Sequence, residues 1–341
     1  MEKILFIAHT QPDGSFPRIA LETLSAAREM AEKLQAVLET AVIGGEPEPA
    51  LNALAACGAK KFYAVGGKDL EAARYSTDIE AVFAAVKAAS PTLIVAPATS
   101  RFSRMMAGVA QRAGGSIDTR VSGLDLTSGL KVQRWYYRQR MLATIARSKR
   151  PWFLLVESGI YPAWKGTPGT VSAEKVSVAL TDQNKKTEVV RFEAASAGAQ
   201  TLRPDAALLF VAGAGWTKKQ ADGQAHIKEA EKLILDMIQK SQASLGSSKS
   251  LVDQSTEGLE VLSFMSHLNQ VGQTGTSPRH PKGLATCCHG EEPHVVGWRF
   301  IKERRAVNLD PNCGWAHGKA DILYVADAFK VIEKVNALLG V

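Results

Sequence analysis

The chain has 341 residues and a formal net charge of +7 at pH 7. This length favours two domains, and the moderate apolar and charged contents exclude a disordered chain. No apolar run reaches the roughly 20 residues of a membrane-spanning helix, so we expect no membrane insertion. The weakly basic N-terminus has no cleavage site for a secretory signal, and we therefore expect a cytoplasmic protein.

The first two-fifths of the sequence alternate between strand-like and helix-like segments. Short apolar runs predict strands, and apolar residues spaced three and four apart predict helices. The predicted strands are Ile4–Ala8, Ala41–Gly45, Lys61–Val65 and Pro91–Pro97, and the predicted helices are Pro17–Leu38, Pro49–Cys57, Thr77–Ala89 and Ser103–Arg112. Strands joined by such helices predict a mainly parallel sheet with right-handed crossovers.

From about Val121 the pattern changes to shorter strands separated by turns. These predicted strands are Lys131–Tyr137, Met141–Arg147, Phe153–Val156, Val171–Val178 and Val189–Phe192. The small, polar stretch Ala194–Gln200 then predicts a linker. We therefore place an N-terminal α/β domain at residues 1–195 and a second domain at residues 196–341.

The second domain reads as another α/β unit, with a doubly wound sheet. Its predicted strands are Ala206–Val211, Gly283–Cys288, Arg305–Leu309 and Ile322–Val325, and its predicted helices are Ala225–Ala243 and Phe329–Leu339. Gly213–Gly215 follows the first strand, where doubly wound folds bind phosphate. Lys218 occupies the third glycine position of G-x-G-x-x-G, so a simple tight turn is the better interpretation.

Basic residues gather between residues 101 and 150. They are Arg101, Arg104, Arg112, Arg120, Arg134, Arg138, Arg140, Arg147, Lys149 and Arg150. No helix-turn-helix, RNA-binding aromatic motif or zinc-finger spacing accompanies them, so we expect no nucleic-acid partner. A solvated basic face and a protein-contact surface both remain open.

Four cysteines in a chain of this length do not make a disulfide framework. Cys57 stands alone in a helical stretch and is predicted to be a buried small residue. A metal site could be formed by Cys287, Cys288 and His289 together with Cys313 and His317, because Cys and His bind soft metals. Adjacent cysteines lack the usual C-x-x-C spacing, however, so we predict no metal site.

A catalytic thiol is a further alternative for Cys287 or Cys288. It would need His289 or His294 as a neighbouring base and a lowered thiol pKa. Proximity in the sequence does not establish that geometry, so this alternative stays open.

Two polar, small-residue turns, Gly246–Asp253 and Gln270–Gly275, lie close together in the sequence. Glycine lets the main chain approach a phosphate-bearing ligand, and Ser and Thr hydroxyls add donors. Lys249 adds a cation to the hydroxyl and amide groups of these turns. Ordinary loop polarity explains the same residues equally well.

The order of these motifs resembles the electron-transfer flavoprotein alpha subunit family. Its members carry G-A-S-R-x-x-V-D, Q-V-G-Q-T-G, G-I-S-G-A-I-Q-H, I-x-A-I-N-x-D-P and V-A-D in this order. The matching stretches are Gly246–Asp253 with Lys249 at the arginine, Gln270–Gly275 in full, His294 at the histidine, Ala306–Pro311 and Val325–Asp327. Lys3–Leu5, Ala26–Arg28 and Ala96–Ser100 extend the resemblance over nearly the whole chain.

The resemblance implies an electron carrier and not an enzyme. FAD would be held by the C-terminal domain of a heterodimer with a beta subunit, between a dehydrogenase donor and a quinone reductase or other acceptor. Carried over by position, the cofactor-binding residues are Ser248, Lys249, Gln270, Gly272, Gln273, Thr274, His289, His294, Asn308 and Asp327. Lys249 would lie near the isoalloxazine, His294 near its C2 carbonyl, and Asn308 and Asp327 at the adenosine side.

The chain departs from the family pattern at two places. The family's S-G-G-R-G is here Ala212-Gly213-Ala214-Gly215-Trp216, so its arginine is missing. Glu291 and Glu292 stand where the family has small, neutral residues, and inward-facing carboxylates would oppose an anionic ligand. These departures leave open a member that keeps the fold and heterodimer but has lost FAD, and acts as a structural or adenine-nucleotide-binding subunit.

Overall fold

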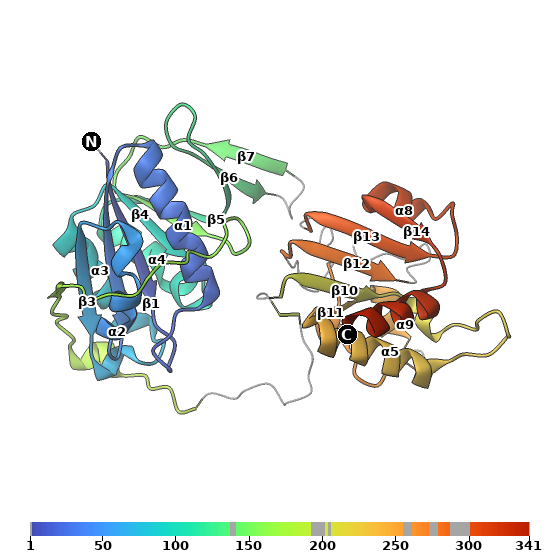
Figure 1. Cartoon of the computed structure of the whole chain (residues 1–341). Coiled ribbons are helices and arrows are strands. Elements are labelled where there is room, and N and C mark those ends of the chain that lie inside the picture. Colours follow the sequence, from blue (N-terminus) through green and yellow to red (C-terminus); the bar gives the residue numbers. More distant parts are fainter. Residues whose placement is uncertain are drawn as a thin grey trace. The chain divides into compact units, whose positions relative to one another are not determined.

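The computed structural model describes residues 2–136, 141–191, 202–203, 206–254, 261–272, 279–286 and 301–340. Its internal contacts divide the chain into two compact units, Met1–Phe192 and Glu193–Val341. Both units are α/β (Figure 1). The domain boundary expected between residues 195 and 196 lies outside the described residues.

The sheet of the first unit has nine strands in its described residues, in the order β7-β6-β5-β8-β4-β1-β2-β3-β9. The strands are β1 (Lys3–His9), β2 (Val37–Gly44), β3 (Lys61–Gly66), β4 (Leu93–Pro97), β5 (Ser116–Asp125), β6 (Lys131–Tyr136), β7 (Met141–Ile145), β8 (Trp152–Val156) and β9 (Ala173–Lys175). Among the described strands of this sheet, only β5–β6 and β6–β7 pair antiparallel. The mainly parallel sheet predicted from the sequence is confirmed.

Helices cover both faces of this sheet. α1 (Arg18–Lys33) and α2 (Glu48–Ala53) pack on one face, and α3 (Tyr75–Ala89) and α4 (Ser100–Arg112) pack on the other (Figure 1). The central strands are buried on both faces, which explains their continuous apolar runs. The short 3-10 helices η1 (Ala55–Cys57), η2 (Lys68–Leu70) and η3 (Asp182–Lys185) complete the unit.

Three predicted segments of this unit differ from the structure. The helix predicted over Pro17–Leu38 ends at Lys33, because Gln35 turns left-handed with φ +49° and the chain enters β2 at Val37. The strand predicted over Val189–Phe192 is absent from its described residues 189–191. Of the strand predicted over Val171–Val178, only β9 pairs with the sheet.

β5 was not predicted, because its sequence mixes polar and apolar residues without regular alternation. A buried carboxylate fixes this strand. The Asp118 side chain has no exposed surface and accepts hydrogen bonds from Trp152 Nε1 (2.9 Å), Arg147 Nη2 (2.9 Å) and Arg134 Nη1 (3.2 Å). Burial opposes ionisation, but the hydrogen bonds from Arg147 and Trp152 outweigh it and hold the pKa of Asp118 below its usual range.

Residues 157–172 run from β8 across the α1 face to the far edge of the sheet. Glu22 of α1 is buried and accepts hydrogen bonds from the Ser158 hydroxyl and the Gly159 N–H, both over 2.8 Å. Trp164 packs into the same apolar cluster as α1. These contacts bring the chain to β3, where it pairs as β9.

The sheet of the second unit has five parallel strands in its described residues, in the order β11-β10-β12-β13-β14. The strands are β10 (Leu208–Ala212), β11 (Ser244–Ser247), β12 (Lys282–Thr286), β13 (Glu303–Asn308) and β14 (Ile322–Val325). Numbered along the chain this is the order 2-1-3-4-5 of doubly wound folds, which confirms the predicted class. The strand order therefore reverses between β10 and β12.

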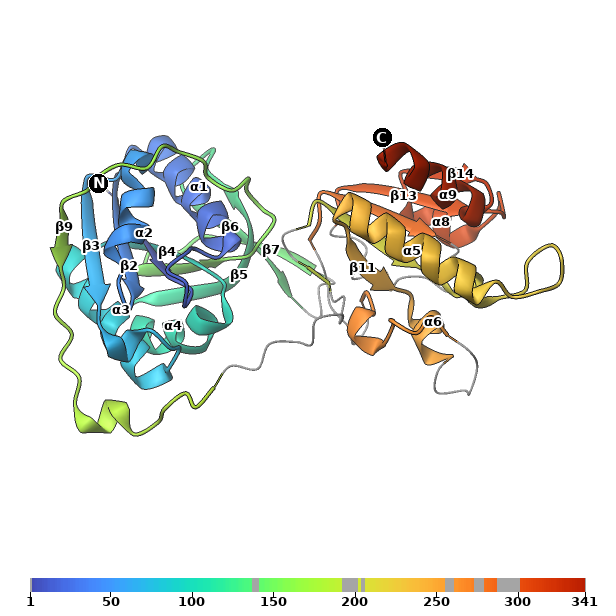
Figure 2. The same ribbon diagram turned by 60° about the horizontal axis from the view of Figure 1, so that its bottom comes forward.

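Helices again lie on both faces. α5 (Ile227–Ser241) and α9 (Ala328–Leu339) pack together over one face (Figure 2). α8 (Gly314–Lys319) packs on the other face through Ala316. The short elements are η4 (Ala214–Thr217), α6 (Lys249–Asp253) and η5 (His267–Asn269). Within the described ranges, no helix combines the length and the apolar character needed to cross a lipid bilayer.

Replacing Asp118 by asparagine is expected to lower the free energy of unfolding by about 2–3 kcal/mol, because buried charge-assisted hydrogen bonds are lost. In the wild type, the contribution of the Asp118 carboxylate to the free energy of unfolding is complete above its unfolded-state pKa of about 3.9. This contribution is lost as the pH falls through the lower folded-state pKa of Asp118. Urea unfolding followed by tryptophan fluorescence at several pH values measures both effects. Asp125→Asn, on the same strand but partly exposed, is the control; an equal effect there would contradict the prediction.

Candidate functional site

The described candidate residues of the second unit lie at one edge of its sheet. Ser248 and Lys249 follow the carboxyl end of β11, Asn308 ends β13, and Asp327 follows β14. The carboxyl ends of parallel strands share one edge, and doubly wound folds bind ligands there, at the point where the strand order reverses. The residues fall into two groups, one beside β11 and one beside β13 and β14.

The first group is held together by a close backbone contact. Ser247 forms an isolated parallel bridge with Gln270, and the Val271 N–H donates to the Ser247 carbonyl over 3.1 Å. Gly246 makes room for this approach, since a Cβ there would lie 2.7 Å from Val271 Cγ2. The end of β11 and the described part of the second motif, Gln270–Gly272, therefore lie side by side in space.

The hydroxyl and amide groups of this part are buried. Ser248 has no exposed surface; its Oγ accepts from the Leu251 N–H over 3.3 Å and so caps α6. Gln270 is also buried, and Gly272 has a left-handed φ of +82°. The sequence predicted a turn across Gly246–Asp253, but the structure makes it the end of a strand and a short helix. Backbone pairing with β10 decides this, because the local residues favour turns.

Ser247 is a polar residue that sequence reasoning did not single out. Its Oγ is buried and has no hydrogen-bond partner among the described residues. The family pattern has alanine at this place, and that departure was the signal in the sequence. An unsatisfied hydroxyl at the end of β11 adds hydrogen-bonding capacity beside the Ser248 and Gln270 groups.

Lys249 is paired within its own helix. Its ammonium contacts the carboxylate of Asp253, one turn further along α6, and Asp253 also accepts from His267 Nε2 over 3.0 Å. The hydrogen bond from Lys249 is the main cause that lowers the pKa of Asp253. Part of the positive charge of Lys249 is therefore offset. The i,i+4 spacing was a signal in the sequence for this pair, whereas the position of His267 was not.

The second group lies at a small recess. Asn308 and Asp327 line it together with Gly215 and Phe329, and its volume is about 20 Å³. Asn308 Oδ1 accepts from the Asp310 N–H over 3.0 Å, and Asp327 Oδ1 accepts from the Phe329 N–H over 2.8 Å. This volume holds about one water molecule. The recess is therefore too small to enclose a nucleoside.

Several candidates lie outside the described residues. They are Gln273, Thr274, His289 and His294, together with Cys287, Cys288, Glu291 and Glu292. Cys57 is buried, as predicted. Within the described part of the chain, no three His, Cys, Asp or Glu side chains are grouped so as to hold a metal ion.

The basic residues between 101 and 150 are largely paired inside the first unit. Arg101 is buried against Asp78 (2.6 Å), Arg112 contacts Glu80 (2.8 Å), and Arg150 contacts Glu2 (2.5 Å). The two arginines of the Asp118 network add to these pairs. Many of these arginines therefore form ion pairs that stabilise the fold of the first unit.

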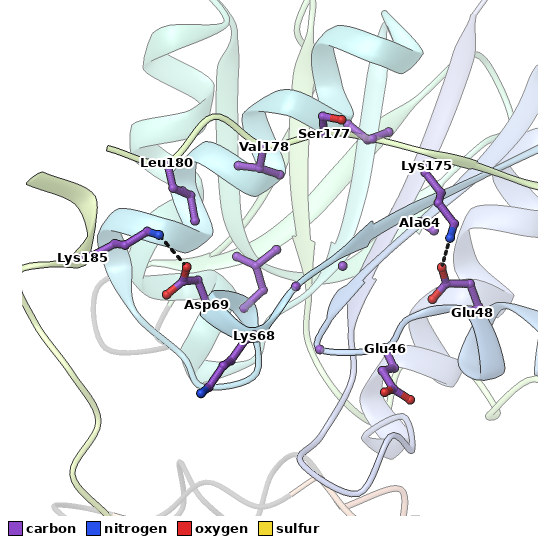
Figure 3. A pocket seen from close by; sticks show the side chains of 15 residues that line it. Glu46, Glu48, Ala64, Lys68, Asp69, Lys175, Ser177, Val178, Leu180 and Lys185 are labelled. Carbon is purple, nitrogen blue, oxygen red and sulfur yellow. Dashed lines mark ion pairs between the residues drawn. The ribbon is translucent and has the colours of Figure 1, made fainter. Parts of the chain in front are cut away.

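A separate cavity of about 630 Å³ lies in the first unit, between the end of β3 and the segment after β9. Charged residues line it, but most are paired: Lys185 contacts Asp69 over 2.9 Å, and Lys175 contacts Glu48 over 3.6 Å (Figure 3). None of the candidate cofactor-binding residues lines this cavity. The candidate site is therefore at the sheet edge of the second unit.

Comparison with known proteins gives the same family as the sequence motifs. The family model described as "Electron transfer flavoprotein domain" matches residues 4–197, more than half of the chain. The chain belongs to the electron transfer flavoprotein family. The prediction of the family is confirmed, and members of this family carry electrons and are not enzymes.

The relatives identify the alpha-type branch of the electron transfer flavoproteins. "Electron transfer flavoprotein subunit alpha" of Clostridium acetobutylicum is 25% identical, covering 98% of this chain and 96% of its own. The same subunit of Thermoanaerobacterium thermosaccharolyticum is 25% identical (97% and 96% covered), and "Protein FixB" of Clostridium saccharobutylicum is 23% identical (98% and 94% covered). With identities of 23–25%, the chain is a divergent alpha-type member.

A comparison with solved structures gives a match to E. coli ADP-heptose LPS heptosyltransferase II. The alignment covers 99% of this chain and 98% of the other, with 11% identity and a TM-score of 0.24. This TM-score is too low to indicate a common fold.

Gly246→Ala is expected to separate the two motifs, because the new methyl group would collide with Val271. Overpacking of this kind costs about 1–3 kcal/mol of unfolding free energy. Hydrogen exchange should also show that the Val271 amide loses protection, since its bond to Ser247 breaks. Gly318→Ala is the matched control, because no atom lies within 4 Å of its added Cβ. A protected Val271 amide in Gly246→Ala would contradict the prediction.

Lys249→Met is expected to raise the pKa of Asp253 toward its ordinary value, because the largest stabilising contact of the carboxylate is removed. An NMR pH titration of the Asp253 carboxyl group measures the change. Lys240→Met removes a similar i,i+4 pair with Asp236 on α5 and should leave Asp253 unchanged. An unchanged titration of Asp253 in Lys249→Met would show that the pair does not form.

Proposed function

We propose that this chain is the FAD-holding alpha subunit of an electron transfer flavoprotein heterodimer. The observation that supports it most is the junction of the Gly246–Asp253 and Gln270–Gly272 segments at the carboxyl edge of a doubly wound sheet. The donor set there fits an anionic dinucleotide, because it consists of hydroxyls, an amide, a left-handed glycine and an ammonium group. FAD, when bound, supplies the redox chemistry.

The residues of this chain would bind and orient the cofactor. Ser248, Gln270 and Gly272 would present hydroxyl, amide and main-chain groups at the edge of the sheet, together with Gln273 and Thr274. Lys249 would add a cation toward the isoalloxazine, moderated by Asp253. His289 and His294 would complete this side, and Asn308 and Asp327 would meet the ribose hydroxyls of the adenosine side.

The remaining parts of the proposal follow from the family. A beta subunit would complete the heterodimer, a dehydrogenase would supply electrons, and a quinone reductase or another acceptor would take them. The protein would work in the cytoplasm without nucleic acid or membrane insertion. We place the border between the partner-contacting domain and the FAD domain at residues 195 and 196.

A second candidate is a member that binds an adenine nucleotide without the flavin. Gly215 stands at the arginine of the family pattern and lines the recess, where it adds no positive charge. The Lys249–Asp253 pair further reduces the cationic character of the site. Both features weaken the attraction for a pyrophosphate, and neither opposes an adenosine hydroxyl.

Co-expression of the full chain with its beta subunit tests the proposal. The purified heterodimer is expected to be yellow, and denaturation should release stoichiometric FAD, identified by mass spectrometry. Asp327→Ala should release less FAD, because it removes a hydrogen-bond acceptor at the recess. A colourless heterodimer that releases AMP would favour the second candidate, and one that releases no nucleotide would contradict both.

A further inference from the structure

Trp216 occupies an unusual position for a large aromatic residue. It lies in η4, a four-residue turn at the exit of β10, yet it has no exposed surface. Its indole N–H donates to Thr286 Oγ1 over 2.8 Å, and the Thr286 hydroxyl donates to the Val211 carbonyl over 3.1 Å. The side chain therefore ties the turn after β10 to the end of β12, across the reversal point of the strand order.

The same indole holds the first turn of α9. Its ring lies against Phe329, with centroids 4.6 Å apart and planes tilted by 50°. Phe329 also meets His226 edge-on at 6.4 Å, so residues of the β10–α5 connection contact it twice. The Phe329 N–H donates to the Asp327 carboxylate, and the Val331 N–H donates to the Asp327 carbonyl over 3.0 Å.

These contacts connect Trp216 to both walls of the recess. Gly215 precedes it in the chain and forms one wall, and Phe329, which it touches, forms another. Asn308 and Asp327 lie in the same recess. The separation of η4 from α9 at this point therefore depends on the size and hydrogen bond of the indole.

We propose that Trp216 is a positioning residue, which fixes the distance between η4 and α9 so that Asn308 and Asp327 meet the ribose hydroxyls of an adenine nucleotide. This role rests on the proposed function. The family pattern has glycine at this place, so the indole is a feature of this chain. No cation is among the described residues that line the recess, which suits uncharged hydroxyls better than a phosphate group.

The test uses the full chain co-expressed with its beta subunit, stripped of bound nucleotide, and 5′-AMP as the probe. Trp216→Phe keeps an aromatic ring but removes the N–H donor and part of the volume. It is expected to weaken 5′-AMP binding at least tenfold, measured by calorimetry. Without ligand, the amides of Phe329 and Val331 should exchange at least tenfold faster, while the amides of α5 keep their protection.

Three control variants separate positioning from general stability. Thr286→Val removes the acceptor and should act like Trp216→Phe, whereas Thr286→Ser keeps the hydroxyl and should behave like the wild type. Trp152→Phe removes an equally buried indole, bonded to Asp118 in the first unit, and should leave both measurements unchanged.

Two results would overturn the role of Trp216. One is unchanged AMP binding and unchanged exchange in Trp216→Phe; the other is faster exchange spread evenly over the second unit, which would make Trp216 only a core residue. If the wild type binds neither FAD nor AMP, the proposed function fails. The exchange of the first turn of α9 then decides whether Trp216 fixes that turn.

Discussion

The close approach of Gly246 to Val271 is the contact on which the candidate site depends. Because Gly246 has no side chain, the Gln270–Gly272 segment lies against the end of β11 and extends the sheet there. This brings the hydroxyl of Ser248 and the amide of Gln270 to one edge, and the left-handed Gly272 follows. A parallel sheet alone would place the ends of its strands together. It would not place the Gln270–Gly272 segment there, because this segment is not part of a regular strand pair.

The positive charge of the chain has a different role from the one its distribution in the sequence indicates. The arginines between 101 and 150 form a dense run, yet five of them contact carboxylates of the first unit. Two share the buried Asp118, where charge-assisted hydrogen bonds fix a strand that has little apolar character. Net charge along a sequence therefore overestimates the free charge on the surface when the acidic partners are far away in the chain.

The sequence predicts the apolar elements well and the polar ones poorly. The strand at Ile322–Val325 has the predicted bounds, and the helix predicted over Phe329–Leu339 differs by one residue, because apolar periodicity determines both. Ser244–Ser247 was missed because its residues favour turns, and Ser116–Asp125 because its polar and apolar residues do not alternate regularly. Only pairing with distant strands makes both segments extended. The pair of Lys249 with Asp253 could be foreseen from spacing, whereas the contact between Trp216 and Phe329 joins residues more than a hundred positions apart.

The missing arginine and the pairing of Lys249 with Asp253 act in the same physical direction. Gly215 replaces an arginine, and Asp253 offsets part of the charge of Lys249, so the site loses cationic character at both of its ends. What remains is mainly hydroxyls, amides and main-chain groups, together with the carboxylate of Asp327 and the partly offset ammonium of Lys249. Neutral hydrogen bonds are individually weaker than charge-assisted ones, so such a site has to gain affinity from the accuracy of its geometry. If the proposed function holds, a glycine contact and a buried tryptophan would therefore matter as much here as the groups that would touch the ligand.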